Sequence, residues 1–370
     1  MIQKNWFEIE DPEKLHTPAL LVYPERIAKN IDLMISIAGD VKKLRPHIKT
    51  HKTAEIIQMQ MKKGINKFKC ATIAEAELLA LNGAKDILLA MQPVGANIHR
   101  FLKLMKAYPD SQFSTLVDSI EIANEISSLA EAEGVIVSLF VDLNTGMNRT
   151  GITPDGTALS LYKKIGELDF VKEAGLHSYD GHLRNPDFSE RKKACDLAFK
   201  KVLGLKESIE KEGLKVNCLV LGGSPSFPIH AKRDGVEVSP GTTLLWDEGY
   251  GNLFKEMPFL KAAVLACRII SKPAENILCL DLGHKAIASE MSFPRLKIFG
   301  LEESLQIGQS EEHLVLEYDK SDGLSIGDLF YGIPKHICPT VAKYPKLLTV
   351  KDGKLTGEWK VAARDHQLNI

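Results

Sequence analysis

Short apolar runs alternate with amphipathic stretches between residue 44 and about residue 255. Eight runs are rich in β-branched residues, which is typical of strands. Between most of them, as in 73–84 and 119–134, apolar residues recur at three- and four-residue spacing, which indicates helices. Eight strand–helix units favour a (β/α)8 TIM barrel, an α/β fold, over an open doubly wound sheet, because no GxGxxG follows the first strand. The expected strands are 44–49, 67–72, 86–92, 113–119, 135–144, 170–179, 216–224 and 236–242.

After residue 255 the pattern changes to short strands joined by Gly, Asp and Pro turns, without helices between them. This predicts a small C-terminal all-β domain. The apolar run at 18–23, "PALLVY", lies outside the eight barrel strands, so we expect the N-terminal region to pack on the β domain. We therefore expect a barrel domain over 17–255 and a β domain formed by 256–370 together with 1–16.

The composition is that of a globular enzyme, with 370 residues, 44% hydrophobic and 26% charged. The formal net charge of −1 gives no electrostatic reason to expect nucleic acid or an anionic membrane as partner. No apolar run reaches the length of a membrane span, and acidic residues interrupt the start, unlike a signal peptide. The six cysteines form no CxxC pair, which fits a reducing compartment, so we expect a cytoplasmic protein.

The stretch "LRPHIKTHK" (44–52) contains the first candidate for chemistry. Strand alternation would point Arg45, His47 and Lys49 into the barrel, with Lys49 at the carboxyl end, where barrel enzymes keep their active sites. Burial lowers the pKa of a lysine and makes its amine nucleophilic, and a Schiff base with an aldehyde cofactor is a standard use of such an amine. A polar barrel mouth without chemistry is the alternative.

The ends of other expected strands add groups that suit one cofactor. The turn at Gly222, Gly223 and Ser224 follows strand seven, where barrels often bind phosphate, and Gly241 and Thr242 follow strand eight as second candidates. Arg149 lies in the glycine-flanked turn after strand five and could pair with an anion or a ring substituent. Tyr179 ends strand six beside His177 and could contact a ring, although a core tyrosine is an equal alternative. Lysine, phosphate turn, arginine and tyrosine together describe a pyridoxal phosphate pocket.

A second candidate site lies in "YGIPKHICPTVA" (331–342). Pro334 and Pro339 favour an extended segment, in which His336 and Cys338 would project to one side. An imidazole and a thiolate could then bind one divalent metal, most readily zinc, with positions left open for water and substrate. The alternative is a buried cysteine beside an ordinary loop histidine.

Six motifs, taken in order, resemble those of a known family. They are "RPHIKTHK", "NTGMNRTG", "GLHSYDGH", "LGGSPS", "SPGT" and "HICPT". They are similar to the motifs of the metal-activated pyridoxal enzymes, the D-threonine aldolase and D-serine dehydratase family, whose alanine racemase-like fold type III joins a barrel to a β domain. The resemblance extends from "TPALLVY" to "VAARD".

The resemblance implies roles for these residues. Lys49 corresponds to the Schiff-base lysine and the Gly222–Gly223–Ser224 turn to the phosphate cup. Arg149, Tyr179 and His47 correspond to neighbours of the cofactor. His336 and Cys338 match the metal pair, with zinc or manganese, that binds the β-hydroxyl of a D-amino acid. The family is typically a homodimer.

The resemblance further implies a lyase and leaves two reactions open. A D-threonine aldolase would give glycine and an aldehyde, and a D-serine dehydratase would give an oxo acid and ammonia; Cys338 tilts slightly toward the second, and overall resemblance toward the first. A racemase would use a second base, for which the β domain offers Tyr318, Tyr331 and Tyr344. A non-catalytic pyridoxal phosphate carrier is the remaining alternative. The auxiliary base is left open among His47, His51, His177 and His182.

Overall fold

The structure, a computed structural model, describes residues 5–370 and divides into two compact units. The unit here called the barrel unit comprises Met34–Lys49, Ile57–Gly241 and Asp365–Ile370. The other, here called the strand unit, comprises Thr50–Ile56, Thr242–Arg364 and the described part of Met1–Leu33. The expected domain boundary at residue 255 stays a prediction.

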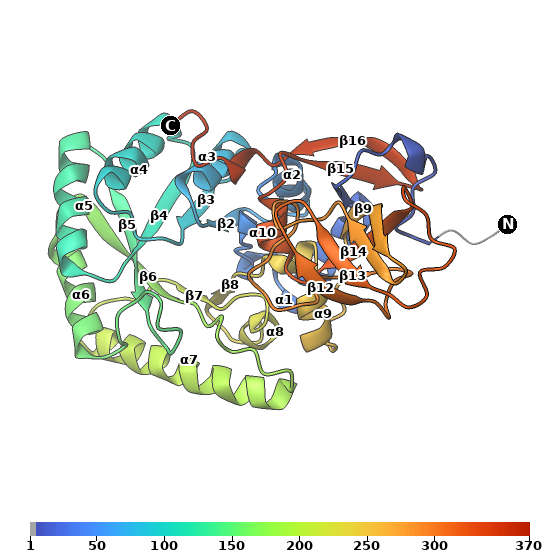
Figure 1. The fold of residues 1–370 in the computed structure, drawn as a ribbon. Helices are drawn as coiled ribbons and strands as arrows, with labels where there is room; N and C mark the ends of the chain where they lie inside the picture. The colour runs from blue at the N-terminus through green and yellow to red at the C-terminus, as the bar shows by residue number, and fades with distance from the viewer. Residues whose placement is uncertain (1–4) are drawn as a thin grey trace. The chain divides into compact units, whose positions relative to one another are not determined.

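A seven-stranded parallel sheet forms the core of the barrel unit, and its strands follow one another in chain order. The strands are β2 (Lys67–Cys70), β3 (Asp86–Leu89), β4 (Gln112–Val117), β5 (Val137–Leu143), β6 (Val171–Ser178), β7 (Leu219–Leu221) and β8 (Val236–Val238). The helices are α2 (Ala54–Lys62), α3 (Ile73–Leu81), α4 (Ala96–Ala107), α5 (Ile120–Glu133), α6 (Gly156–Glu167), α7 (Phe188–Lys211) and α8 (Phe227–His230). Figure 1 shows α3 to α6 on the outer side of these strands. Six of the seven strands lie within an expected range, and β4 begins one residue before its own.

Residues 44–47 take the eighth position, between β8 and β2. Leu44 forms a parallel bridge with Val238, and His47 forms one with Lys69. The His47 N–H donates to the Pro240 carbonyl at 2.9 Å, and the Lys69 N–H donates to the Pro46 carbonyl at 2.9 Å. The segment therefore closes the sheet, and the barrel class is confirmed. The expected regular strand 44–49 is wrong, because Pro46 has no N–H to donate and the chain turns at Ile48–Thr50 into a 3-10 helix, η3.

Side-chain caps fix where the helices of the barrel unit begin. The Thr72 hydroxyl accepts from the Glu75 N–H at 3.1 Å, and the Ser119 hydroxyl accepts from the Ile122 N–H at 3.3 Å. Each satisfies an N–H that has no partner within its helix. Gly134 ends α5 in the left-handed region, with φ of 67°. The helices expected within 73–84 and 119–134 are therefore present as α3 and α5.

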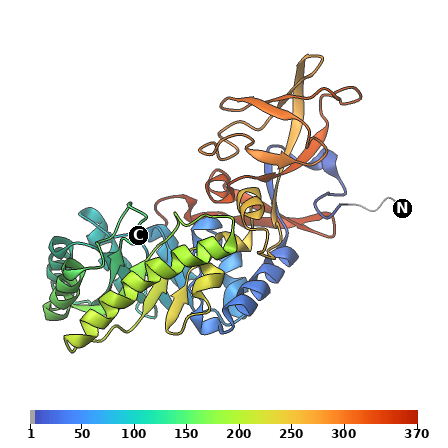
Figure 2. The ribbon, with the colours of Figure 1, turned by 90° about the horizontal axis from the view of Figure 1, so that it is seen from below.

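The strand unit is built on a nine-stranded sheet in the order β12-β13-β10-β9-β1-β15-β16, with β14 paired to β9 and β11 (Figure 2, where β9 to β14 are yellow to orange). β1 pairs antiparallel with β9 and parallel with β15, so the N-terminal strand does pack on the C-terminal strands as expected. The expected β domain is confirmed as mostly strand. Its elements are β1 (Ala19–Val22), β9 (Ala263–Ala274), β10 (Ile277–Leu280), β11 (Leu296–Ile298), β12 (Leu305–Gln309), β13 (Leu314–Glu317), β14 (Leu329–Pro334), β15 (Lys346–Lys351), β16 (Lys354–Lys360) and the helices α1 (Pro24–Ala38, which continues into the barrel unit), α9 (Glu248–Leu253) and α10 (Ile337–Val341).

Over residues 5–370, no helix combines the length and the apolar character that crossing a bilayer requires.

Arg45 ties the closing segment to the sheet. Its guanidinium pairs with Asp86 of β3 at 2.6 Å and with Glu237 of β8 at 2.7 Å, and its side chain is 3% exposed. Burial works against the charge, but the bond to Asp86 and the charges of both carboxylates outweigh it and raise the arginine pKa further. Two ion pairs thus compensate for the few main-chain bonds of residues 44–47.

Replacing Arg45 by Met is expected to lower the free energy of unfolding by about 3–5 kcal/mol, because it leaves two carboxylates beside an uncharged buried side chain. Urea unfolding of both proteins measures the difference. Lys106→Met is the matched control, since the Lys106–Glu133 pair lies in solvent and its loss should leave unfolding nearly unchanged. Equal stabilities of Arg45→Met and wild type would contradict the role given to Arg45.

Candidate active site

Three cationic side chains of the barrel unit surround the ring of Tyr179. The Lys49 Nζ lies 5.6 Å, the Lys69 Nζ 5.9 Å and the Arg149 Cζ 4.9 Å from the ring centroid. Lys49 comes from η3, Lys69 from β2, and Arg149 from the loop after β5, while Tyr179 directly follows β6. Such a concentration of positive charge beside an aromatic ring suits an anionic ligand with a planar ring.

Sequence reasoning missed Lys69, which is 3% exposed within β2. Its Nζ lies 2.7 Å from the His177 Nε2, and the His177 Nδ1 lies 2.6 Å from an Asp142 carboxylate oxygen. Burial, followed by the positive charge of Lys49, lowers the pKa of Lys69 to about 7. The available signal was a lysine between Phe68 and Cys70 in a strand that should be buried.

The two glycines of the turn after β7 are required by space. A side chain at Gly222, which has φ of +75°, would lie 2.6 Å from the Ser226 hydroxyl, and one at Gly223 would lie 2.9 Å from the Tyr179 ring. The N–H of Gly222 donates to the Ser178 carbonyl, and the N–H of Gly223 donates to the Ser226 hydroxyl. The glycines therefore bring the turn against Tyr179, and their own N–H groups are engaged within the chain.

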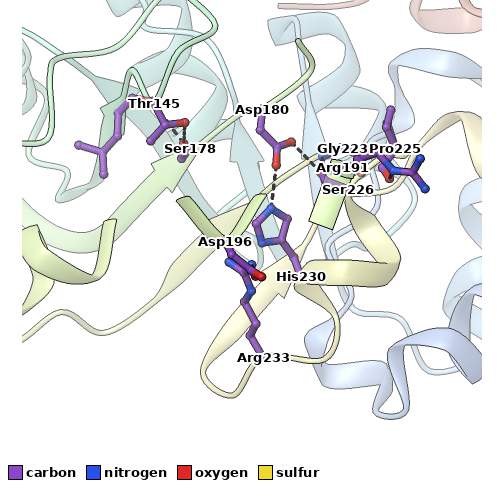
Figure 3. Close-up of polar contacts among 11 residues, drawn as sticks. Thr145, Ser178, Asp180, Arg191, Asp196, Gly223, Pro225, Ser226, His230 and Arg233 are labelled. Carbon is purple, nitrogen blue, oxygen red and sulfur yellow. Dashed lines mark hydrogen bonds and ion pairs between the residues drawn. The ribbon is translucent and has the colours of Figure 1, made fainter. Parts of the chain in front are cut away.

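A buried set of hydrogen-bonded polar side chains contacts this turn. The Ser226 hydroxyl donates to Asp180 at 2.6 Å, and the other Asp180 oxygen lies 2.7 Å from the His230 Nε2 (Figure 3). Burial tends to raise the pKa of Asp180, but His230 and Ser226 outweigh it and lower that pKa below its usual value. Arg191 donates to the Pro225 carbonyl at 3.1 Å. Asp180 is therefore a charged anchor for the Gly222–Gly223 turn.

Ser224 and Gly241 are brought together, whereas Thr242 has a different contact. The Gly241 N–H donates to the Ser224 hydroxyl at 3.1 Å. The Thr242 hydroxyl, in the strand unit, lies 3.5 Å from the Cys338 Sγ, and the Thr50 hydroxyl lies 3.2 Å from the same sulfur. Thr242 thus contacts one of the two expected metal ligands. Thr50, which follows Lys49 in the sequence, was not among the expected site residues.

The backbone is extended as far as His336 but helical from Ile337 to Val341, so the expected extended segment is wrong at Cys338. His336 is the N-cap of α10, and Cys338 and Pro339 lie in the first turn of this helix. Proline is tolerated in a first turn, so Pro339 does not prevent the helix. The His336 Nδ1 lies 2.5 Å from a Glu290 oxygen. Burial disfavours the charge of His336, but Cys338, Glu290 and Asp247 outweigh it and raise its pKa to about 9.

His336 affects Cys338 in return. Burial alone would raise the pKa of the Cys338 thiol, but its interaction with His336 lowers it. A thiolate is the form in which cysteine binds a metal. The donor chemistry of this imidazole–thiol pair, both in the strand unit, therefore fits a soft divalent cation.

In the described part of the chain, one group of three metal-ligand types lies within 4.8 Å, formed by Asp180, Cys195 and His230. Burial raises the pKa of the Cys195 thiol to about 12, so it keeps its proton, and Asp180 already bonds His230 directly. Asp180 and His230 of this group belong to the hydrogen-bonded set beside the glycine turn.

The other histidines differ in their surroundings. His47 is 8% exposed, and its Nδ1 accepts from the Lys49 N–H at 3.3 Å, so it lies beside the candidate lysine. His51 is fully buried, and burial lowers its pKa to about 3, while its Nδ1 lies 3.2 Å from the Thr53 hydroxyl. His182 is exposed.

Comparisons with known proteins show which families the chain resembles. The family described as alanine racemase, N-terminal domain, matches residues 22–248, and a putative serine dehydratase domain matches residues 262–350. The chain is 26% identical to a 3-hydroxy-D-aspartate aldolase of Paracoccus denitrificans over 96% of this chain and 93% of that protein. It is 26% identical to a D-threonine aldolase of an Arthrobacter species, over 95% and 93%.

Among solved structures, a D-threonine aldolase from Filomicrobium marinum has the same fold, with a TM-score of 0.88 and 24% identity over 96% of this chain and 98% of that one. Since the first family match spans more than half of the sequence, the chain belongs to the alanine racemase N-terminal domain family. The resemblance to the D-threonine aldolase and D-serine dehydratase family is thereby confirmed.

The depressed pKa of Lys69 has a consequence for stability. Between pH 7 and pH 10 the unfolded chain holds a proton on this amine that the folded chain has lost, so folding becomes more favourable as pH rises. Relative to Lys69→Met, the wild type should gain about 1.4 kcal/mol of unfolding free energy per pH unit in this range. Urea unfolding at several pH values measures it. Lys200→Met, at an exposed site, should run parallel to wild type; a parallel profile for Lys69→Met would refute the expectation.

Proposed function

We propose that this protein is a lyase dependent on pyridoxal phosphate and a divalent metal, acting on β-hydroxy D-amino acids. Its reaction is of the D-threonine aldolase type, in which the hydroxyl loses its proton, the Cα–Cβ bond breaks, and glycine and an aldehyde are formed. The observation that carries this proposal is the placement of Lys49 and Arg149 around the Tyr179 ring, against which the Gly222–Gly223 turn packs. The similarity to aldolases along nearly the whole chain supports it.

The residues of the barrel unit have distinct roles in this proposal. The Lys49 amine would bind the cofactor's aldehyde, and Arg149, Tyr179 and His47 would adjoin its ring. The turn at Gly222, Gly223 and Ser224, with Gly241, would face its phosphate. When bound, pyridoxal phosphate supplies an electron sink for the bond that breaks. The excess of positive charge around Tyr179 fits the anionic cofactor.

In the strand unit, His336 and Cys338 would bind the metal, zinc or manganese, which would lower the pKa of a substrate hydroxyl. Thr50 and Thr242 contact the Cys338 sulfur and would orient it for this role. Thr242 would therefore orient the metal ligand Cys338, in addition to its expected role at the phosphate.

A second reaction, dehydration of D-serine to pyruvate and ammonia, is favoured by two specific observations. One is the match of residues 262–350 to a putative serine dehydratase domain. The other is Cys338 itself, whose lowered thiol pKa suits zinc. A racemase has less support, because Tyr331 and Tyr344, two of its three candidate bases, lie in the strand unit with burial raising the pKa of both.

Product analysis separates these reactions. Purified protein with pyridoxal phosphate and zinc or manganese is incubated with D-threonine and followed by NMR. Glycine with acetaldehyde is expected; 2-oxobutyrate with ammonia would establish the dehydratase instead, and L-threonine or an allo-threonine would indicate an epimerase. EDTA should abolish turnover, whereas a racemase or a carrier should be insensitive to it. Sedimentation velocity on the same preparation tests the proposed homodimer.

The turn offers a test of cofactor binding alone. Gly223→Ala places a methyl group 2.9 Å from the Tyr179 ring, so affinity for pyridoxal phosphate should fall at least about fivefold, since overpacking of a tight site costs about 1–3 kcal/mol. Absorbance titration measures the affinity. Gly156→Ala, where no atom lies within 4 Å, is the matched control and should bind as wild type does. Undiminished binding by Gly223→Ala would remove the turn from the pocket.

A further inference from the structure

Lys69 has hydrogen-bonding surroundings that no other lysine of the pocket shares. Asp142 accepts from the Thr150 hydroxyl at 2.9 Å with one oxygen and lies 2.6 Å from the His177 Nδ1 with the other. The Nε2 on the opposite side of the same ring lies 2.7 Å from the Lys69 Nζ. Asp142, His177 and Lys69, here called the buried chain, thus run from the carboxylate to the amine, and all three are at most 5% exposed.

The direction of these bonds follows from the carboxylate. Burial disfavours the charge of Asp142, but His177 and Thr150 outweigh it and lower its pKa, so the group accepts and does not donate. The His177 Nδ1 must therefore carry the hydrogen. Burial and the neighbouring Lys69 lower the pKa of His177, so the ring is neutral and its Nε2 has a lone pair. Lys69 donates to that lone pair whether or not it is charged.

The charges that face Lys69 come from several elements. Lys49 and Arg45, from the closing segment, disfavour its positive charge, while Asp142 of β5 and Asp180 after β6 favour it. Arg149 and the Tyr179 hydroxyl belong to the same pocket, since Lys69, Lys49 and Arg149 all lie within 6 Å of the Tyr179 ring centroid. Because its pKa is lowered to about 7, Lys69 can change its charge near neutral pH while it is only 3% exposed.

We propose that Lys69 is a positioning residue for Lys49. The buried chain holds the Lys69 amine beside Lys49, and the charge of the Lys69 amine sets the pH at which the nitrogen that joins Lys49 to the cofactor loses its proton. The inference rests on the proposed function, because it takes Lys49 to carry pyridoxal phosphate. A cation at residue 69 repels a proton on the nitrogen that joins Lys49 to the cofactor, whereas a neutral amine does not. The pocket therefore changes its proton affinity when Lys69 titrates.

The test follows the absorbance of bound pyridoxal phosphate against pH in wild type, Lys69→Met and Lys69→Arg. The Arg variant keeps a permanent charge and the Met variant has none, so the midpoint should be lower in Lys69→Arg by about one pH unit, with wild type between them or equal to one of them. Lys200→Met is the surface control and should match wild type. Equal midpoints in Lys69→Arg and Lys69→Met would overturn the proposal, since a purely structural role does not depend on charge.

A second measurement needs neither the cofactor nor a variant. Nitrogen NMR of the histidines in cofactor-free wild type should show His177 neutral, with its hydrogen on Nδ1, from pH 6 to pH 8. A charged His177, or a hydrogen on Nε2, would overturn the proposal by removing the acceptor for Lys69. Borohydride reduction and peptide mapping of the loaded wild type check the premise separately. Absence of cofactor on Lys49 would refute the proposed function, while the NMR result would still decide whether the buried chain exists.

Discussion

The barrel closes through residues 44–47, which pair with the sheet as isolated bridges and not as a regular strand, and the ion pairs of Arg45 add to their main-chain hydrogen bonds. Arg45 reaches Asp86 on one flanking part of the sheet and Glu237 on another. Because charges this deeply buried are stable only when paired, the position of residues 44–47 is fixed by electrostatics as much as by the sheet. Lys49 comes four residues after Arg45, so its approach to Tyr179 depends on that closure.

The pocket shows how one barrel can keep several cations in a small volume. Asp180 is charged because Ser226 and His230 hold it, and Asp142 is charged because His177 and Thr150 hold it. Both carboxylates are bonded to neighbouring side chains of the protein. The basic side chains around the Tyr179 ring therefore stay available to a ligand, and a negative cofactor would complete the balance of charge.

Periodicity along the chain was sufficient to predict most of the architecture. Apolar runs locate seven strands because buried parallel strands have a distinctive composition. The same reasoning failed where a proline stood inside the pattern. The strand expected at 44–49 contains Pro46, and the chain leaves it for a 3-10 helix that includes Lys49. The extended segment expected around Cys338 is instead a helix that has Pro339 in its first turn. Lys69 could not be assigned, because its importance lies in a contact with His177, 108 residues further along the chain.

The pairing of β1 imposes an order on the biosynthesis of the chain. Leu21 is opposite Val264 on one side and Leu348 on the other, so the first strand of the described chain has both of its neighbours after the barrel strands in the sequence. The seven strands of the barrel can associate once residue 238 has left the ribosome, since each has its partner within the preceding sequence. β1 must wait for β9, which begins 25 residues after the end of β8, and for β15, which begins 108 residues after it, so its apolar residues stay unpaired for that part of translation.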